Sequence, residues 1–300
     1  MNPSATTVPH VYTLTGNLLA ERTLAFPNWS PGRTQRAREE TFQVGGKGIN
    51  VSKMLTRLGA ANTALCFTGG APGAECESWL RARGVSFVAF DTGRPTRVGT
   101  VVRDDGATHA ETTFLGPDVP ASAAAVQACA AFLDQLPAGQ VLAVCGSVPG
   151  WTTPAFAPLR AALARWSERG WLVADTYGAP LAELVTGRLA LLKINADELR
   201  TLPGGGSSPL PRTIERVIIS DGPRSVQVRD EHGAHATLIP PPIREVSATG
   251  SGDVLLACVV QAHFVRKLPL KDAVAFAIPY AAANAAHPGI AEFSDPIPTP

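Results

Sequence analysis

The residues best suited to chemistry are four consecutive ones near the C-terminus, Gly250-Ser251-Gly252-Asp253, which stand immediately before the apolar run 254–258. Glycines at the start of a helix let backbone N–H groups approach an anion, and the helix dipole favours negative charge there. An aspartate in the first turn could take a proton from an attacking hydroxyl. Such a segment would suit phosphoryl transfer, with Asp253 as the base and Gly250, Ser251 and Gly252 as donors to the phosphoryl group.

Taken alone, the segment favours a purely structural interpretation, because acidic residues are common in the first turn of any helix and glycines are common in tight turns. A second glycine-rich segment, Gly45-Gly46-Lys47-Gly48-Ile49-Asn50, lies about 200 residues upstream and also precedes an amphipathic stretch, 51–58. Neither segment has the spacing of a Walker loop. Taken together, the two segments favour the functional interpretation.

The elements that must position these residues follow a regular pattern from residue 60 onwards. Short apolar runs alternate with longer amphipathic stretches, which is typical of βαβ units on a parallel sheet. Two stretches, 24–44 and 91–114, break this pattern and predict a small separate sheet. Pro279 should kink or split the last helix. Strands are predicted at 64–67, 141–145, 171–174, 189–192 and 217–219, and helices at 74–83, 121–136, 155–169, 179–185, 250–266 and 270–286.

The composition excludes several classes of protein. The 300 residues include 26 Lys and Arg against 25 Asp and Glu, and this balance argues against nucleic acid or an anionic membrane as a partner. No apolar stretch approaches the length of about 18 residues that a membrane span needs, and no leader is evident. The five cysteines lack CxxC spacing and the histidines are scattered, so we expect reduced core cysteines and no metal cluster. A cytoplasmic protein is expected.

The two glycine-rich segments, in this order and at this separation, resemble the two signatures of the ribokinase-like (PfkB) sugar kinases. Further matches occur at Thr96-Arg97, 146–149, 174–176 and 193–198, so the resemblance covers nearly the whole chain. It implies one α/β domain over residues 1–300, built as a three-layer sandwich around a central, mostly parallel sheet. It also implies a small β-sheet lid, formed by residues of about 20–44 and 92–115, through which a homodimer pairs.

The resemblance further implies ATP and Mg²⁺ as cofactors. Asn195 and Glu198 match an Asn-x-x-Glu element that organises Mg²⁺ and the nucleotide phosphates, with Glu198 holding the metal indirectly through water. The alternative for Glu198 is a solvated helix face. The remaining nucleotide-binding positions implied by the resemblance are Lys193, Ser220, Gly222, Thr249 and Asn284.

For the acceptor, the Gly-Gly-Lys-Gly-Ile-Asn form looks most like the phosphofructokinase and tagatose-phosphate kinase branch, whose members phosphorylate sugars that already carry a phosphate. Arg forks and Lys point charges are suited to hold that phosphate. One position departs from the family: Glu21 stands where related kinases have an aspartate that grips two ring hydroxyls, and its extra methylene would move the carboxylate. The substrate-binding residues expected are Glu21, Arg36, Gly46, Lys47, Asn50, Arg97 and Ser147.

Fructose 1-phosphate, converted to fructose 1,6-bisphosphate, is the acceptor that the branch resemblance favours, followed by tagatose 6-phosphate and fructose 6-phosphate. Two rival functions remain open at this point. One is a kinase of an unphosphorylated sugar or nucleoside, for which Arg36 and Arg97 would be ordinary surface residues. The other is a non-catalytic protein that binds sugar phosphates, against which the intact segment 250–253 stands.

Overall fold

The centre of the molecule is a nine-stranded sheet with the order β13-β12-β11-β10-β9-β8-β1-β4-β5. The computed structural model describes residues 8–104, 111–202 and 210–295. All neighbouring strands from β5 to β11 are parallel, and β12 and β13 continue one edge in antiparallel fashion. The mostly parallel sheet predicted from the sequence is confirmed. Its strands are β1 (Val11–Thr15), β4 (Asn62–Thr68), β5 (Phe87–Asp91), β8 (Val141–Cys145), β9 (Trp171–Asp175), β10 (Leu191–Asn195), β11 (Val217–Ser220), β12 (Val226–Arg229) and β13 (His235–Leu238).

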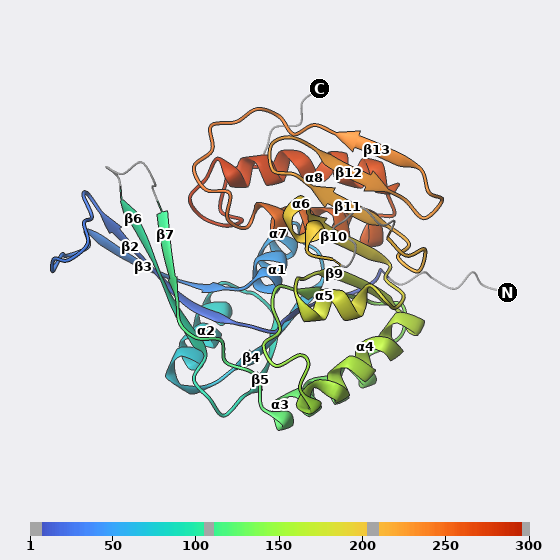
Figure 1. The fold of residues 1–300 in the computed structure, drawn as a ribbon, viewed down its shortest axis with the longest axis horizontal. Coiled ribbons are helices and arrows are strands. Elements are labelled where there is room, and N and C mark those ends of the chain that lie inside the picture. The colour runs from blue at the N-terminus through green and yellow to red at the C-terminus, as the bar shows by residue number, and fades with distance from the viewer. Residues whose placement is uncertain (1–7, 105–110, 203–209, 296–300) are drawn as a thin grey trace.

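Helices cover both faces of this sheet and complete three layers (Figure 1). In β8, Leu142 and Val144 pack into the core shared with α3, α4 and α5, whereas Val141 and Ala143 pack into the core shared with α1, α7 and α8. Burial on both faces explains why such strands are continuous apolar runs in the sequence. The helices are α1 (Lys47–Arg57), α2 (Gly70–Ala82), α3 (Ala123–Gln135), α4 (Ala157–Arg169), α5 (Ala179–Leu184), α6 (Ala196–Arg200), α7 (Ser251–Val260) and α8 (Leu270–Ala285).

A second sheet of four strands, in the order β3-β2-β6-β7, extends away from the main body (Figure 1). Cys76 and Leu80 of α2 pack against Ala20 and Val44, which anchors the small sheet to the large one. The two stretches that break the sequence pattern therefore do form one small sheet, although residues 105–110 lie outside the described part. Its strands are β2 (Leu19–Phe26), β3 (Glu39–Gly45), β6 (Arg97–Asp104) and β7 (Glu111–Leu115).

Two local predictions need correction, and three strands were missed. Strand β10 begins at Leu191, two residues later than predicted, and the strands β5, β12 and β13 were not predicted. The last helix continues through Pro279, so the predicted split is wrong. Proline removes one hydrogen bond, but Ala277, Ile278 and Ala282 around it are buried against the rest of the core, and this packing maintains the helix.

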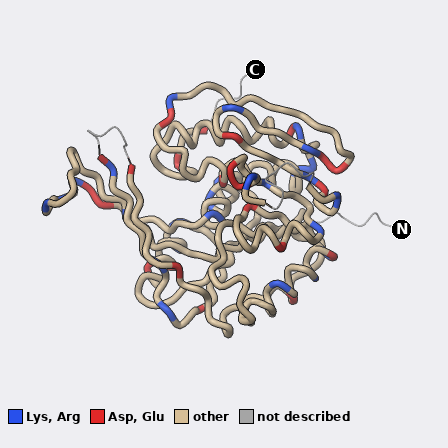
Figure 2. Tube along the Cα trace, viewed as in Figure 1, with Lys and Arg blue, Asp and Glu red and all other residues tan. Residues whose placement is uncertain are grey.

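The surface and the cysteines agree with the composition. Figure 2 shows Lys and Arg interspersed with Asp and Glu along the described chain. All five cysteines are free and buried, as predicted. Within residues 8–104, 111–202 and 210–295, none of the helices combines the length and the apolar character that crossing a membrane requires.

Candidate active site

Most of the predicted functional residues gather at the edge of the large sheet where its parallel strands end. Ser147 follows β8, Asn195 ends β10 and Ser220 ends β11, in register with Asn195. The N-termini of α1 and α7 reach the same edge, since Lys47 and Asp253 both interact with side chains from these strand ends. In open α/β sheets, ligands bind outside the carboxyl ends of the strands. The sheet topology therefore selects this edge as the candidate active site.

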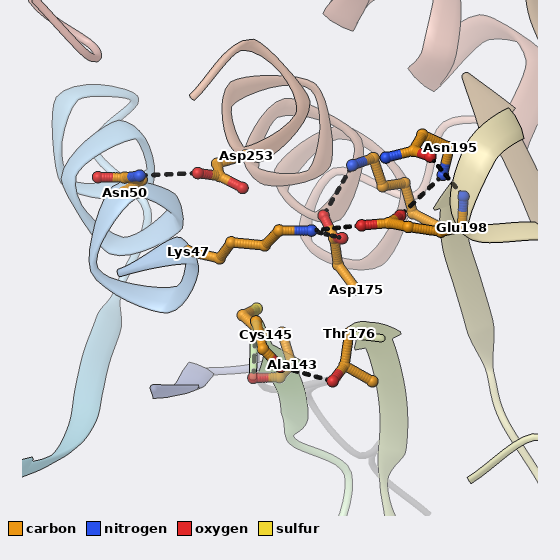
Figure 3. A network of polar contacts seen from close by, with 11 residues as sticks. Lys47, Asn50, Ala143, Cys145, Asp175, Thr176, Asn195, Glu198 and Asp253 are labelled. Atoms are coloured by element: carbon orange, nitrogen blue, oxygen red, sulfur yellow. Dashed lines mark hydrogen bonds and ion pairs between the residues drawn. The ribbon is translucent and has the colours of Figure 1, made fainter. Parts of the chain in front are cut away.

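Asp253 lies in the first turn of α7 and is only 6% exposed. Its Oδ2 accepts a hydrogen bond of 2.7 Å from Nδ2 of Asn50 on α1, which joins the two glycine-rich segments across 203 residues (Figure 3). Burial, reinforced by the neighbouring Asp175 carboxylate, raises the pKa of Asp253 to about 6, against the attraction of Lys193 and Lys47. A base with this pKa is largely ionised at neutral pH and can accept a proton.

The turn before α7 leaves two backbone donors available. Gly250 has a φ of +76°, and a Cβ on it would lie 2.6 Å from the side chain of Ile290, so only glycine fits there. The N–H of Ser251 donates to the carbonyl of Ala248, whereas those of Gly250 and Gly252 make no hydrogen bond within the described residues. Of the three predicted backbone donors, only the N–H groups of Gly250 and Gly252 are thus available to an anion.

Asn284 on α8 holds this turn in place. Its Nδ2 donates to the carbonyl of Thr249 at 3.0 Å and to Oγ of Ser251 at 3.1 Å, and its Oδ1 accepts from the N–H of Ala291 at 2.9 Å. The side chain is 1% exposed, so these contacts satisfy it within the protein. These contacts show that Asn284 maintains the shape of the turn before α7.

Two lysines share one buried carboxylate at the centre of the site (Figure 3). Nζ of Lys47 lies 3.0 Å from Oδ1 of Asp175 and 3.1 Å from Oε1 of Glu198, and Nζ of Lys193 lies 2.8 Å from Oδ2 of Asp175. Burial alone would raise the pKa of Asp175, but the two ammonium groups outweigh it and hold that pKa below its usual value. Burial alone would lower the pKa of Lys47, yet Asp175, Glu198 and Asp253 together raise it. Lys47 therefore stays protonated.

Lys193 brings positive charge directly to the start of α7. A Cβ on Gly252 would lie 2.7 Å from Nζ of Lys193, so the ammonium group rests against this glycine. An anion at the N-terminus of α7 would meet unpaired N–H groups and a nearby ammonium group together. Because residue 252 has no Cβ, the Lys193 ammonium group has space beside the start of α7.

Asn195 and Glu198 form a capping box at the start of α6. Oδ1 of Asn195 accepts from the N–H of Glu198 at 2.7 Å, and Oε2 of Glu198 accepts from the N–H of Asn195 at 3.0 Å. The Glu198 side chain is 15% exposed and also bonds Lys47, so the interpretation as a solvated helix face is wrong. Two further predicted nucleotide-binding positions, Thr249 and Gly222, lie in turns, Gly222 with a φ of +53° after the end of β11.

The carboxylates of the site suit Mg²⁺ only in an indirect way. Among the described residues, no group of three or more His, Cys, Asp or Glu could hold a metal ion by itself. Mg²⁺ commonly keeps several waters and binds one or two carboxylates together with substrate phosphates. Glu198, beside the lysines that would face the phosphates, fits this arrangement.

A second cluster lies on the side of the site next to the small sheet. Nδ2 of Asn17 donates to Oγ of Ser147 at 2.9 Å and to Oδ1 of Asp118 at 2.8 Å, and Nη1 of Arg97 donates to the same Asp118 oxygen at 3.0 Å. Gly46, with a φ of +126°, brings the start of α1 against Thr15 at the end of β1. A pocket opens beside this cluster, lined by Gly16, Asn17, Leu18, Phe67, Thr92, Thr96, Arg97 and Val119.

Glu21 and Arg36 both belong to the small sheet, but they differ in position. Glu21 lies on β2 and accepts a hydrogen bond from the Gln43 amide on β3. Burial raises the pKa of Glu21, while the bond from Gln43 opposes the rise. Arg36 is exposed in the connection between β2 and β3, at the end of the small sheet that is remote from the large one (Figure 1). The single chain therefore does not bring Arg36 to the other predicted residues.

Four residues of the site were not among the predicted ones. Asp175 links the two lysines, Asn17 and Asp118 link Ser147 to Arg97, and the ring of Tyr177 lies 5.5 Å from Nζ of Lys47. Asp175 ends the buried apolar strand β9 and Tyr177 follows it, on the side where ligands bind, which is a signal that the sequence does contain. Asp118 stands in an irregular connection, and no pattern indicates its partners.

An α/β sheet with a positively charged, glycine-rich helix start and a buried aspartate of raised pKa defines a phosphoryl-transfer enzyme. Residues 17–297 match the pfkB family of carbohydrate kinases, so the chain belongs to this family and is a carbohydrate kinase.

Individual relatives agree on the family and differ in their acceptors. The chain is 27% identical over 298 residues to a 1-phosphofructokinase of Borreliella burgdorferi, covering 95% of this chain and 94% of that one. It is 28% identical over 225 residues to a D-tagatose-1-phosphate kinase of Bacillus licheniformis, covering 71% and 72%. The fold is similar to that of phosphofructokinase-2 from Escherichia coli in complex with fructose-6-phosphate, with a TM-score of 0.82, 22% identity and coverage of 92% and 94%.

Proposed function

We propose that this kinase transfers the γ-phosphoryl group of ATP to a sugar that already carries one phosphate, with fructose 1-phosphate as the first candidate acceptor. The observation that carries the proposal is the buried Asp253, whose pKa is raised to about 6 at the N-terminus of α7. Asn50 and the pair of lysines around Asp175 complete its surroundings. This combination suits a base that acts on a hydroxyl beside a negatively charged phosphoryl group.

In the proposed mechanism, Asp253 takes the proton of the attacking hydroxyl while Asn50 keeps the carboxylate oriented. Gly250 and Gly252 donate their N–H groups to the phosphoryl oxygens, and Lys193 adds its charge at the same place. Glu198 would hold Mg²⁺ through water, and the metal would supply neutralisation of the phosphate charge. Apart from the metal, each proposed contribution would come from a side chain or backbone group of this chain.

Two observations support a phosphorylated sugar as the acceptor. Arg97 and Asn17 beside the pocket provide donors for a phosphate at the end of the sugar remote from Asp253. Relatives over most of the chain carry the names 1-phosphofructokinase and D-tagatose-1-phosphate kinase. Fructose 6-phosphate and the tagatose phosphates are the second candidates, since the same cations would hold them.

The small sheet would act as a lid over the sugar and as the surface through which two chains pair. Its strands carry exposed apolar side chains, among them Val98, Phe114 and Leu115 at 43%, 52% and 55% exposure. Such side chains on an exposed strand favour association with a second sheet. Sedimentation should give the mass of a dimer, and a monomer at all concentrations would contradict this assembly.

A substrate panel tests the acceptor directly. ATP consumption should be measured with fructose 1-phosphate, fructose 6-phosphate, tagatose 6-phosphate, tagatose 1-phosphate, free fructose and a nucleoside. We expect the phosphorylated ketoses to exceed the last two in kcat/KM. Turnover of free fructose or a nucleoside alone would contradict the proposal, and binding of sugar phosphates without turnover would indicate the non-catalytic alternative.

The pH dependence of turnover provides a separate prediction. Because Asp253 acts only when unprotonated and its pKa is about 6, kcat/KM should fall about tenfold per pH unit below pH 6 and stay level above it. The substrate phosphate itself ionises at a pKa of about 6, so its titration must be followed by ³¹P NMR and divided out. A profile that is flat from pH 5 to 8 after this correction would exclude Asp253 as the base.

A further inference from the structure

Asp118, between β7 and α3, places its carboxylate against two groups that the proposed function assigns to the substrate. Its Oδ1 lies 3.0 Å from Nη1 of Arg97 and 2.8 Å from Nδ2 of Asn17. The Arg97 side chain is 13% exposed, whereas that of Asp118 is 57% exposed. A solvated carboxylate is thus paired with a cation whose side chain is largely covered.

The donors around this oxygen form an incomplete anion site. Nε of Arg97 is buried and has no hydrogen-bond partner among the described residues, and Arg97 is one of the residues that line the pocket. Buried N–H donors are normally paired, so an unpaired one next to a pocket indicates a group that is absent from the free chain. Oδ1 of Asp118 accepts from Nη1 of Arg97 and from the Asn17 amide, but not from Nε. The phosphate group of a sugar phosphate has three terminal oxygens and could accept from Nε, Nη1 and the Asn17 amide together.

We propose that Asp118 occupies the subsite for the phosphate that the sugar already carries, and that it leaves when this phosphate binds. The inference rests on the proposed function, because it requires a phosphorylated acceptor. A dianionic phosphate competes successfully with one carboxylate for Arg97, whereas the hydroxyl of a neutral sugar does not. Asp118 is therefore a specificity-determining residue that selects against unphosphorylated sugars.

Removal of the competing carboxylate should strengthen binding of phosphorylated ligands. In Asp118→Ala and Asp118→Asn, KM for the sugar phosphate should fall about two- to fivefold, the range typical of a partly exposed ion pair, with kcat and KM for ATP unchanged. Asp118→Asn removes the charge and keeps the shape, so it isolates the electrostatic competition. Asp134→Asn, which breaks the remote exposed pair with Arg165, is the matched control and should leave all constants unchanged.

Binding of inorganic phosphate, followed by calorimetry, tests the subsite without any turnover. Asp118→Asn should bind phosphate two- to fivefold more tightly than the wild type, and this gain should vanish when Arg97→Ala is also present. A higher KM or weaker phosphate binding in Asp118→Asn would show that Asp118 contacts the substrate itself and would overturn the inference. A gain that persists with Arg97→Ala would overturn it as well. A wild type that phosphorylates no sugar phosphate contradicts the proposed function instead.

Discussion

Asp253→Asn should lower kcat about 10²- to 10⁴-fold while the protein stays folded and continues to bind sugar phosphate. The amide has nearly the same shape and can still accept the hydrogen bond from Asn50, but it does not accept a proton from the attacking hydroxyl. The measurement is single-turnover transfer from ATP, together with binding of sugar phosphate by calorimetry. Near-normal turnover would remove Asp253 from the mechanism.

The same variant should also be more stable than the wild type. A folded-state pKa of about 6 lies above the unfolded value near 3.8, so the folded wild type binds more protons than the unfolded chain between these pH values. Its stability therefore falls as the pH rises from about 4 to 6, and the loss is complete above pH 6. Asp253→Asn avoids this loss, so its free energy of unfolding at pH 8 should exceed that of the wild type by about 3 kcal/mol, with little difference at pH 4.

Urea denaturation of both proteins at pH 4, 6 and 8 measures this difference. A stability gain combined with lost turnover would mean that the wild type maintains an unfavourable buried charge for its chemistry. A variant that loses turnover and also unfolds more easily at pH 8 would point to a structural role for Asp253.

The sequence predicted those parts of the fold that depend on local pattern. Strands such as β8 are buried on both faces, so they are unbroken apolar runs, and the amphipathic helices between them have the expected period. The antiparallel strands β12 and β13 were missed because they are short and half-exposed, without a continuous apolar run. Pro279 shows the same limit, since tertiary packing overrides its local preference.

The candidate site was predictable to the extent that its residues stand in glycine-rich segments at helix starts. Asp253 was found in this way and Asn50 through the family resemblance of its segment, and the structure places the two side chains in hydrogen-bond contact. Asp175 and Asp118 were not found, because their roles depend on partners up to 128 residues away in the chain. Contacts between strand ends and loops arise from the order of strands in the sheet, which local patterns do not contain.

Asp175→Asn should destabilise the fold by about 3–5 kcal/mol at pH 7, because it leaves the buried Lys193 ammonium without its charge partner. The pKa of Asp175 is lowered in the folded state, so its stabilising contribution is present above the unfolded pKa near 3.8 and is lost as the pH falls through the folded pKa. The destabilisation should therefore be full at pH 7 and shrink under strongly acidic conditions. Urea denaturation at both pH values measures it, with Asp134→Asn as the control for an exposed carboxylate.

The pH profile of the Asp175→Asn enzyme separates a functional role from a structural one. Asp175 contributes to the raised pKa of Asp253, while Lys193 and Lys47 lower it. Without the Asp175 charge, the pKa of Asp253 should decrease, and the acidic limb of kcat/KM should move below pH 6. Loss of stability alone would leave this limb where it is in the wild type. A shifted limb, in a variant that still folds at 10 °C, would mean that the carboxylate shared by the two lysines also sets the pH range in which the base is active.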